Sequence, residues 1–494
     1  MTTTAPPTER PSGPTGLADT PRIPGTAGPA QVPPRGGLIG RRRRAVAFGL
    51  LVSAQFVVML DTSIVNVALP SIQADLGLSP AGLTWVVNAY VLAFGGLLLL
   101  SGRAADLFGR RRMFIAGSAL FTFGTLLAAA AANEAMLVGA RVIQGIGAAA
   151  LSPAAMSLLL LTFPGPARAK AMSMWGAASA AGGATGVFLG GILTGSFGWS
   201  AVFLVTVPVS VASVVLARRV LDDPATVTRH RFDWAGAVTS TGAVVALVHG
   251  CLGAADGAWT SSSVLSSFVG FVALTAAFIR IERRAAEPLV PLELFASRVL
   301  STGVGLALFG GAARASTFVL VALYLQQALH MAPRHAGLAM VPTALTGFAV
   351  SLVVLPRVLR VLGPRRSLVL GLVVLAGGHL WLAYGPHGSG YLVAVLPGLL
   401  LVATGVALSF TPTTMVVAAA MPQTQTGLAA GVAGSATQVG AALGTAAFTA
   451  IGMAVSGSTA VVLAPSGFTA AFTAAAVVSL ITAALGCTVI RSPH

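Results

Sequence analysis

Three ionisable residues lie deep within long apolar stretches of this sequence: Asp61, Arg141 and Arg314. Charged side chains are costly at membrane depth, and those that occur there usually face a cavity and serve a function. Asp61 is the only acid that lies deep in any of these stretches. The alternative for Asp61 is a hydrated position near the outer interface of the bilayer.

Gln144 follows Arg141 by three residues, so the two side chains lie on one face of a helix. Arg141 is a few residues inside the outer end of its stretch, and Asp61 is in the outer half of another. We therefore expect Asp61 and Arg141 to share one level of a common cavity.

Arg314 lies roughly 20 Å along a helix that would begin near residue 301, which is close to the middle of a bilayer. An arginine there costs about 2.5–3.5 kcal/mol on insertion scales. Thr317 and Tyr324 lie on the same side of the helix. Two interpretations remain open, a structural position packed against an acid or carbonyl groups and a charge that lines a cavity.

The composition indicates the broad class of protein. The 494 residues are 55% hydrophobic and 9% charged, with a mean hydropathy of +0.87, whereas soluble domains carry about 25% charged residues. The sequence therefore predicts an all-α polytopic membrane protein. The net charge of +16 does not indicate a nucleic-acid partner, because the arginines gather at the ends of the apolar stretches.

Two classes of site are excluded by composition. The only lysine, Lys170, lies between two alanines, whereas a phosphate-binding loop needs Gly-Lys followed by Ser or Thr. Cys251 and Cys487 indicate neither a metal site nor a disulfide framework. We expect no cofactor, no metal and no enzymatic activity, so any transport would use an ion gradient or a separate partner.

The arginines support a count of fourteen membrane spans, each needing about 20 apolar residues. The first 40 or so residues predict a disordered tail, and the four arginines 41–44 hold it in the cytoplasm. With both termini inside, all but three of the 29 basic residues are cytoplasmic or lie in the tail, the exceptions being Arg141, Arg314 and Arg334. The predicted spans are 45–69, 83–101, 113–132, 136–160, 171–194, 200–217, 234–253, 262–281, 301–327, 335–355, 367–384, 391–417, 427–452 and 466–490.

Residues 102–112 and 356–366 form an internal repeat at an offset of 254, in which Gly363 corresponds to Gly109. The repeat makes the first six and last six spans equivalent bundles, with an inserted pair between them. The predicted parts are a disordered cytoplasmic tail (1–44), an N-terminal six-helix bundle (45–218), an inserted two-helix hairpin with its linkers (219–298) and a C-terminal six-helix bundle (299–494).

The charged loop 102–112 reads G-R-x-x-D-x-x-G-R-R-R. Placed between two spans, it resembles the loop between helices 2 and 3 of the major facilitator superfamily. The resemblance implies that fold, and a cytoplasmic gate that latches the two halves when the transporter opens outward. The alternative is a solvated loop whose arginines only fix orientation. The predicted gate residues are Gly102, Asp106, Gly109, Arg110 and Arg111.

Two further stretches resemble one particular family within this superfamily. Residues 60–70 resemble the helix 1 signature of the 14-helix drug:proton antiporter family, in which the aspartate is linked to proton coupling and substrate binding. Residues 141–150 resemble the helix 4 motif of that family, in which the arginine is tied to proton transfer. We assign proton coupling to Asp61 and Arg141. The predicted substrate cavity contains Asn66, Gln144, Arg314, Thr317 and Tyr324.

A glycine-rich run at 182–191 resembles the antiporter motif of the same family, with Val187 where a proline is expected. The glycine face is retained, but the kink that a proline would cause is in doubt. The motif residues are Gly182, Gly186, Gly190 and Gly191. Close helix packing without a role in antiport is an equal alternative.

Five histidines are placed toward the outer side of the membrane. They could sense external pH, but we interpret them as ordinary interface residues. They are His249, His330, His335, His379 and His387.

Together these features predict proton-coupled efflux of a small organic compound, an antibiotic or other drug, by a monomer in the plasma membrane. Alternatives are an exporter or importer of a lipid or metabolite, and a membrane sensor or permease subunit. If Asp61 pairs with Arg141, Arg314 is left as an unmatched positive charge. Such a charge favours a neutral or anionic substrate over a dication.

Overall fold

The structure is a computed structural model that describes residues 1–3, 38–221, 233–255, 259–285, 288–331, 333–386, 390–457 and 463–490. The chain divides into two compact units, Met1–Arg42 and Arg43–His494. Most of the predicted disordered tail lies outside the described residues. One of the five histidines named above, His387, also lies outside them.

The regular elements of the described residues are all helical, which confirms the all-α class. The first group is α1 (Leu38–Leu76), α2 (Pro80–Phe108), α3 (Arg110–Ala129), α4 (Glu134–Thr162), α5 (Pro166–Phe197), α6 (Ser200–Leu204) and α7 (Val207–Val220). The middle pair is α8 (Trp234–Ala255) and α9 (Ser262–Glu282), followed by a short helix η1 (Leu292–Ala296). The last group is α10 (Arg298–Leu323), η2 (Tyr324–Ala328), α11 (Pro333–Ala339), α12 (Val341–Ala349), η3 (Val350–Val354), α13 (Leu355–Tyr384), η4 (Tyr391–Val395), α14 (Leu396–Ala419), η5 (Gln423–Gln425), α15 (Thr426–Ser456) and α16 (Pro465–Ile490).

Thirteen segments of the described chain are long and apolar enough to cross a membrane. One of them, His335–Tyr384, has 50 residues, which is far more than the roughly 20 that a bilayer needs. It contains a break at Gly363, where φ is 73° and ψ is 173°. Counted as two, it brings the number of spans to the predicted fourteen.

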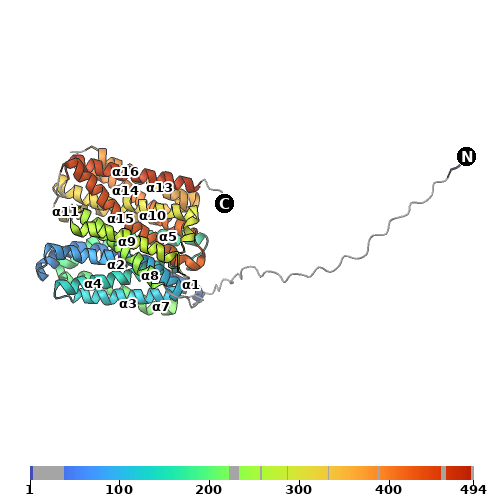
Figure 1. Ribbon diagram of the computed structural model, residues 1–494, viewed down its shortest axis with the longest axis horizontal. Coiled ribbons are helices and arrows are strands. Elements are labelled where there is room, and N and C mark those ends of the chain that lie inside the picture. The colour runs from blue at the N-terminus through green and yellow to red at the C-terminus, as the bar shows by residue number, and fades with distance from the viewer. Residues whose placement is uncertain are drawn as a thin grey trace. The chain divides into compact units, whose positions relative to one another are not determined.

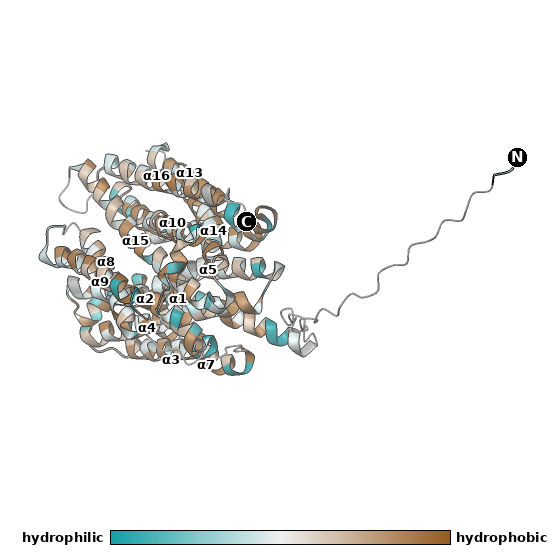
Figure 2. Cartoon of the chain, turned by 45° about the vertical axis from the view of Figure 1, so that its right-hand side comes forward, coloured by the Kyte–Doolittle hydropathy of each residue, from teal (hydrophilic) through white to brown (hydrophobic). Residues whose placement is uncertain are grey.

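The helices of the first and last groups pack mainly within their own group (Figure 1). Helix α4 packs against α2 and α3, and α13 packs against α14 and α16. Hydrophobic residues predominate along the helices of both groups (Figure 2). Helix α8 packs against α9, and it also packs against α2 of the first group and α15 of the last group.

Matching glycines bring matching helix pairs together. A Cβ on Gly117 of α3 would lie 2.6 Å from the backbone nitrogen of Leu151 in α4. A Cβ on Gly371 of α13 would lie 2.7 Å from the backbone nitrogen of Ser409 in α14. Because such short distances exclude any side chain, both helix pairs depend on glycine at these positions. Gly117 and Gly371 are separated by the repeat offset of 254, so the repeat extends from sequence into packing.

The same offset relates the two charged loops. Gly109, between α2 and α3, has φ of 100°, and Gly363, at the break in α13, has φ of 73°. Both values lie in a region that residues with a Cβ rarely adopt. The predicted correspondence of these two glycines therefore reflects a shared backbone requirement.

This requirement predicts the effect of Gly363→Ala. Nothing lies within 4 Å of a Cβ at this position, so the cost is conformational and amounts to about 1–3 kcal/mol. We expect a lower melting temperature for the purified protein in detergent. Gly305→Ala is the matched control, because Gly305 is helical and a Cβ there also meets nothing within 4 Å. We expect it to leave the melting temperature unchanged or to raise it. Equal melting temperatures for the two variants would contradict this account.

Candidate functional site

Asp61, Arg141 and Gln144 form one buried network between α1 and α4. Arg141 Nη1 donates to Asp61 Oδ2 at 2.7 Å and to Gln144 Oε1 at 2.9 Å. Gln144 Nε2 donates to Asp61 Oδ1 at 3.1 Å and to Thr125 Oγ1 of α3 at 2.8 Å. Both carboxylate oxygens of Asp61 are therefore satisfied, as a buried charge requires. Asp61 and Arg141 thus lie at one level of the first bundle, in direct contact.

Neighbours on α2 fix the Arg141 guanidinium. Its Nε donates to the backbone oxygen of Val86 at 3.1 Å, and its central carbon lies 4.3 Å from the ring centroid of Tyr90. Asp61 is fully buried, with 0% of its surface exposed. The alternative of a hydrated aspartate at the outer interface does not describe this conformation.

The charged loop joins the two groups of helices. Asp106 Oδ1 accepts from the backbone nitrogen of Gly427 at 2.9 Å, and Oδ2 accepts from that of Leu428 at 2.7 Å. These nitrogens lie in the first turn of α15, where the unsatisfied amides and the helix dipole favour a negative charge. Arg110 Nη2 donates to Asp106 Oδ1 and to the backbone oxygen of Thr424, at 2.8 Å in each case. Asp106 thus binds the first turn of α15 and Arg110 binds η5 just before it, so the solvated-loop alternative does not hold for these two residues.

The other predicted gate residues support this contact. A Cβ on Gly102 would lie 2.4 Å from the backbone oxygen of Gly427, so only glycine permits this approach of α2 to α15. Gly109 supplies the turn. Arg111 donates instead to the backbone oxygen of Leu221 at 3.2 Å, after α7.

The second copy of the loop makes a different contact. Leu355 and Leu359 of α13 form a buried apolar cluster, and Ala169 of α5 packs against it. Arg360, which replaces the acid of the first copy, is exposed. The contacts between the groups are therefore polar at one copy of the repeat and apolar at the other.

Three glycines of the 182–191 run pack α5 onto α1 beside Asp61. A Cβ on Gly182 would lie 2.5 Å from the backbone oxygen of Phe56, and one on Gly186 would lie 2.8 Å from that of Leu60. A Cβ on Gly190 would lie 3.0 Å from Val67, whereas Gly191 faces open space. Helix α5 continues from Pro166 to Phe197 without an internal proline.

None of the five predicted cavity residues lies in the wall of the cavity between the two groups of helices. Gln144 belongs to the Asp61 network, and three of the others have contacts of their own. Asn66 is exposed and donates to the backbone oxygen of Thr62. Thr317 Oγ1 lies 2.5 Å from His379 Nε2. The ring of Tyr324 packs edge-on against Phe468 and Phe472 of α16.

His379 corrects the interpretation of the histidines. It is fully buried and lies between Thr317 of α10 and Ser479 of α16, so it is not an interface residue. The sequence contained a signal for this position. His379 shares a helix face with Gly371 and Leu375 at a spacing of four residues, and that face packs inside the bundle.

Arg314 is buried, with 4% of its surface exposed. None of its three guanidinium nitrogens has a hydrogen-bond partner among the described residues. The nearest aromatic ring is that of Phe410 in α14, whose centroid is 5.9 Å from the guanidinium carbon.

A cavity of about 100 Å³ lies between the two groups of helices. Both groups contribute to its wall, including Gln55 of α1, Phe94 of α2, Trp175 of α5, Phe410 of α14 and Gln438 of α15. Sequence reasoning missed Phe410. The polar run 409–414 in an otherwise apolar span was the available signal.

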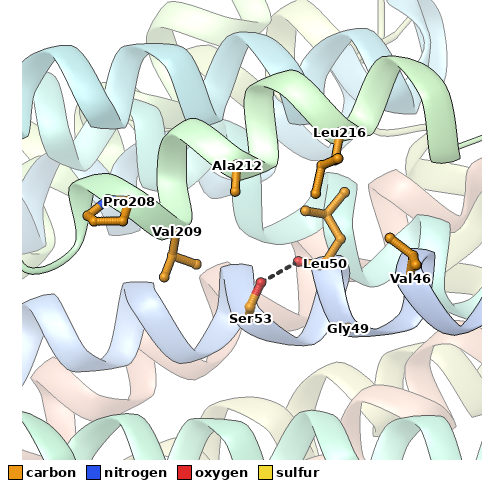
Figure 3. Close-up of a pocket in the computed structure, with 8 residues that line it drawn as sticks. All are labelled: Val46, Gly49, Leu50, Ser53, Pro208, Val209, Ala212 and Leu216. Atoms are coloured by element: carbon orange, nitrogen blue, oxygen red, sulfur yellow. Dashed lines mark hydrogen bonds between the residues drawn. The ribbon is translucent and has the colours of Figure 1, made fainter.

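A second hollow, of about 460 Å³, is an apolar groove between α1 and α7 (Figure 3). Its wall is almost wholly hydrocarbon, and its one hydroxyl, on Ser53, donates to the backbone oxygen of Leu50. The groove includes no residue of the Asp61 network, so we do not assign chemistry to it.

The structure has many helical spans, an internal repeat and a buried ion pair. The contact of Asp106 with the first turn of α15 forms a polar latch between the two groups of helices. Together these features define a polytopic membrane transporter. Residues 51–445 match the family model of the Major Facilitator Superfamily. The chain belongs to the Major Facilitator Superfamily.

Characterised relatives are similar over most of their length. The cephamycin export protein CmcT of Amycolatopsis lactamdurans is 37% identical over 419 residues, which cover 84% of this chain and 86% of that protein. The puromycin resistance protein pur8 of Streptomyces alboniger is 37% identical over 442 residues, covering 87% and 86%. The tetracenomycin C resistance and export protein of Streptomyces glaucescens is 34% identical over 420 residues, covering 84% and 76%.

Solved structures share the fold. The human organic anion transporter MFSD10 superposes with a TM-score of 0.62 at 15% identity, covering 90% of this chain and 99% of that one. The proton:xylose symporter XylE superposes with a TM-score of 0.63 at 15% identity, covering 90% and 95%.

Whether Asp106 holds the two groups of helices together can be tested with a cysteine placed at a buried position between them. Ser157 Oγ of α4 lies 2.6 Å from Thr426 Oγ1 of α15, and both side chains are buried. In protein with Cys251 and Cys487 replaced by serine, Ser157→Cys should react slowly with a water-soluble maleimide. We expect Asp106→Asn to raise the labelling rate about tenfold, because hydrogen bonds to a charged group contribute about 1.5–3 kcal/mol.

Arg360→Gln is the control, since it changes the corresponding residue of the second copy, which is exposed. It should leave the labelling rate unchanged. If Asp106→Asn labels no faster than this control, Asp106 does not hold the halves together.

Proposed function

We propose that this protein exports small organic compounds, antibiotics or other drugs, from the cell in exchange for protons. It would work by alternating access as a monomer in the plasma membrane, with both termini in the cytoplasm. Two of the relatives are named as export proteins and a third as a resistance protein. The observation that carries the proposal of proton exchange is the buried network of Asp61, Arg141 and Gln144.

The network has the chemistry of a proton-operated switch. As a carboxylate, Asp61 accepts from Arg141 and Gln144 at both oxygens. Protonation would remove its negative charge and turn one oxygen into a donor, which faces a donor already in place. The protonated carboxyl would therefore release Arg141 and favour a different arrangement of α1 against α4.

Packing provides a path from this switch to the other half of the molecule. Helix α5 lies on the backbone of α1 next to Asp61 through Gly182 and Gly186. On another face, α5 packs against α12 and α14 of the second group. A shift of α1 would thus be transmitted through α5 to the boundary between the two bundles.

The latch and the cavity support an order of events. With Asp106 bound to α15, the inner end is held shut, and the cavity of about 100 Å³ is smaller than the 300–1,000 Å³ of typical ligand pockets. Loading from the cytoplasm would therefore require release of the latch. Protonation of Asp61 from the outside would accompany the return of the emptied transporter.

Asp61→Asn tests proton coupling. The change keeps the size of the side chain and removes its charge, so uptake driven by an imposed pH gradient into inside-out vesicles should fall to background. The assay would use compounds for which relatives are named: cephamycin, puromycin, tetracenomycin C and, from the lincomycin resistance protein of Streptomyces lincolnensis, lincomycin. Asp75→Asn is the matched control, because Asp75 lies on the same helix and accepts from Trp199 Nε1, outside the network. It should retain uptake.

Asp61→Asn leaves Arg141 buried without its partner, which can cost about 3–5 kcal/mol. The double variant Asp61→Asn, Arg141→Gln removes that cost and should be inserted normally while remaining uncoupled. Gradient-driven uptake by either variant at the parent rate would show that Asp61 does not couple proton movement. An inserted parent that accumulates none of the four compounds would contradict drug export.

A further inference from the structure

Arg314 is a buried cation whose partner is missing among the described residues. All three of its guanidinium nitrogens are buried without a hydrogen bond. Three buried or part-buried acids are already engaged: Asp61 with Arg141, Asp106 with Arg110 and α15, and Glu282 with the backbone nitrogens of Leu289 and Val290. Burying an unpaired charge is strongly unfavourable, so this arrangement is poorly explained as a stabilising element of the bundle.

The surroundings of Arg314 leave room for the guanidinium on its own helix. A Cβ on Gly310, one turn earlier in α10, would lie 2.6 Å from Arg314 Nη1. In this conformation the side chain therefore folds back over Gly310. On its other side is the ring of Phe410.

Phe410 connects Arg314 with the cavity between the two bundles. Its ring lines that cavity, which also contains the aromatic residues Phe94 and Trp175. The same ring has its centroid 5.9 Å from the guanidinium carbon. A rotation of Phe410 about its side-chain bonds would bring the cation to the cavity wall.

We propose that Arg314 and Phe410 form an anion-binding subsite that takes the carboxylate of an exported aromatic compound after the Phe410 ring turns aside. The planar guanidinium can hold a carboxylate through two parallel hydrogen bonds, which a neutral amide cannot match in strength. The aromatic walls suit a flat apolar body attached to that carboxylate. This inference rests on the proposed function and specifies its substrate class.

The subsite can be probed by binding to the purified full-length protein, without a proton gradient. Naphthoate and its neutral amide, naphthamide, have the same aromatic body and differ in charge. Trp175 in the cavity wall reports binding through quenching of its fluorescence. We expect the parent to bind naphthoate about tenfold more tightly than naphthamide, because charge-assisted hydrogen bonds are about twice as strong as neutral ones.

Arg314→Gln should reduce the ratio of the two dissociation constants to about one. Arg360→Gln is the matched control, since it also removes one arginine charge from the last group of helices but at an exposed position. It should keep the parent ratio. A parent ratio near one, or a high ratio that persists in Arg314→Gln, would overturn the subsite.

Chloride is the competing source of negative charge. If naphthoate binds at Arg314, lowering the chloride concentration of the buffer should leave a preference that Arg314→Gln removes. The proposal would be overturned if chloride raised the melting temperature of the parent but not that of Arg314→Gln, and if the parent showed no preference for naphthoate. The site would then bind an inorganic anion.

Stability provides a second, independent measurement. Arg314→Met removes an unpaired buried charge and retains a long apolar side chain, so its melting temperature should equal or exceed that of the parent. A structural arginine would give the opposite result, a clear fall in melting temperature together with an unchanged naphthoate preference. Because neither measurement needs Asp61 or a pH gradient, failure of proton coupling would leave this test intact.

Discussion

A charge buried inside a membrane protein is strongly unfavourable unless another group replaces the water that it has lost. The structure meets this constraint for Asp61 within one bundle, through Arg141 and Gln144. It meets the constraint for Asp106 across two groups of helices, through Arg110 and the first turn of α15. Much of the packing serves these two arrangements. Helices α3 and α4 approach closely at Gly124, where a Cβ would lie 2.7 Å from the backbone of Gln144, and that approach brings the Thr125 hydroxyl to the Gln144 amide.

The two copies of the internal repeat share a backbone arrangement but carry different polar and ionisable residues. Thr125 and His379 are separated by the repeat offset of 254 and lie in corresponding helices. In the first bundle this position binds Gln144 of the Asp61 network, and in the second it binds Thr317. The charged loops differ in the same way, because one copy has Asp106 and the other has Arg360. The backbone requirements of the repeat are shared, whereas its ionisable groups belong to one half or the other.

The sequence predicted the elements that depend on local pattern. Span length, the placement of arginines and the glycine of each charged loop led to the fold, and intramembrane charge led to Asp61, Arg141 and Arg314. Positions that depend on which face of a helix meets which neighbour were harder to predict. The spacing of Thr317 and Tyr324 predicted that they share a side with Arg314, yet Thr317 of α10 contacts α13 and Tyr324 of η2 contacts α16. His379 was wrongly placed because depth along a span does not reveal whether a residue faces lipid or the bundle. Phe410 resembles any apolar residue of a span until α10 is packed beside it.

The two sides of the latch contribute different kinds of hydrogen-bonding group. On α2 it depends on the side chain of Asp106, but on α15 the donors are the backbone nitrogens of Gly427 and Leu428. A backbone donor is present whatever side chain the residue carries, proline excepted. The α15 side of the contact is therefore largely indifferent to residue identity at position 428, while position 427 is restricted by size, because a Cβ there would lie 2.5 Å from the backbone oxygen of Gly102. Spontaneous mutations that loosen this contact should accordingly be concentrated on α2 and at Gly427 of α15.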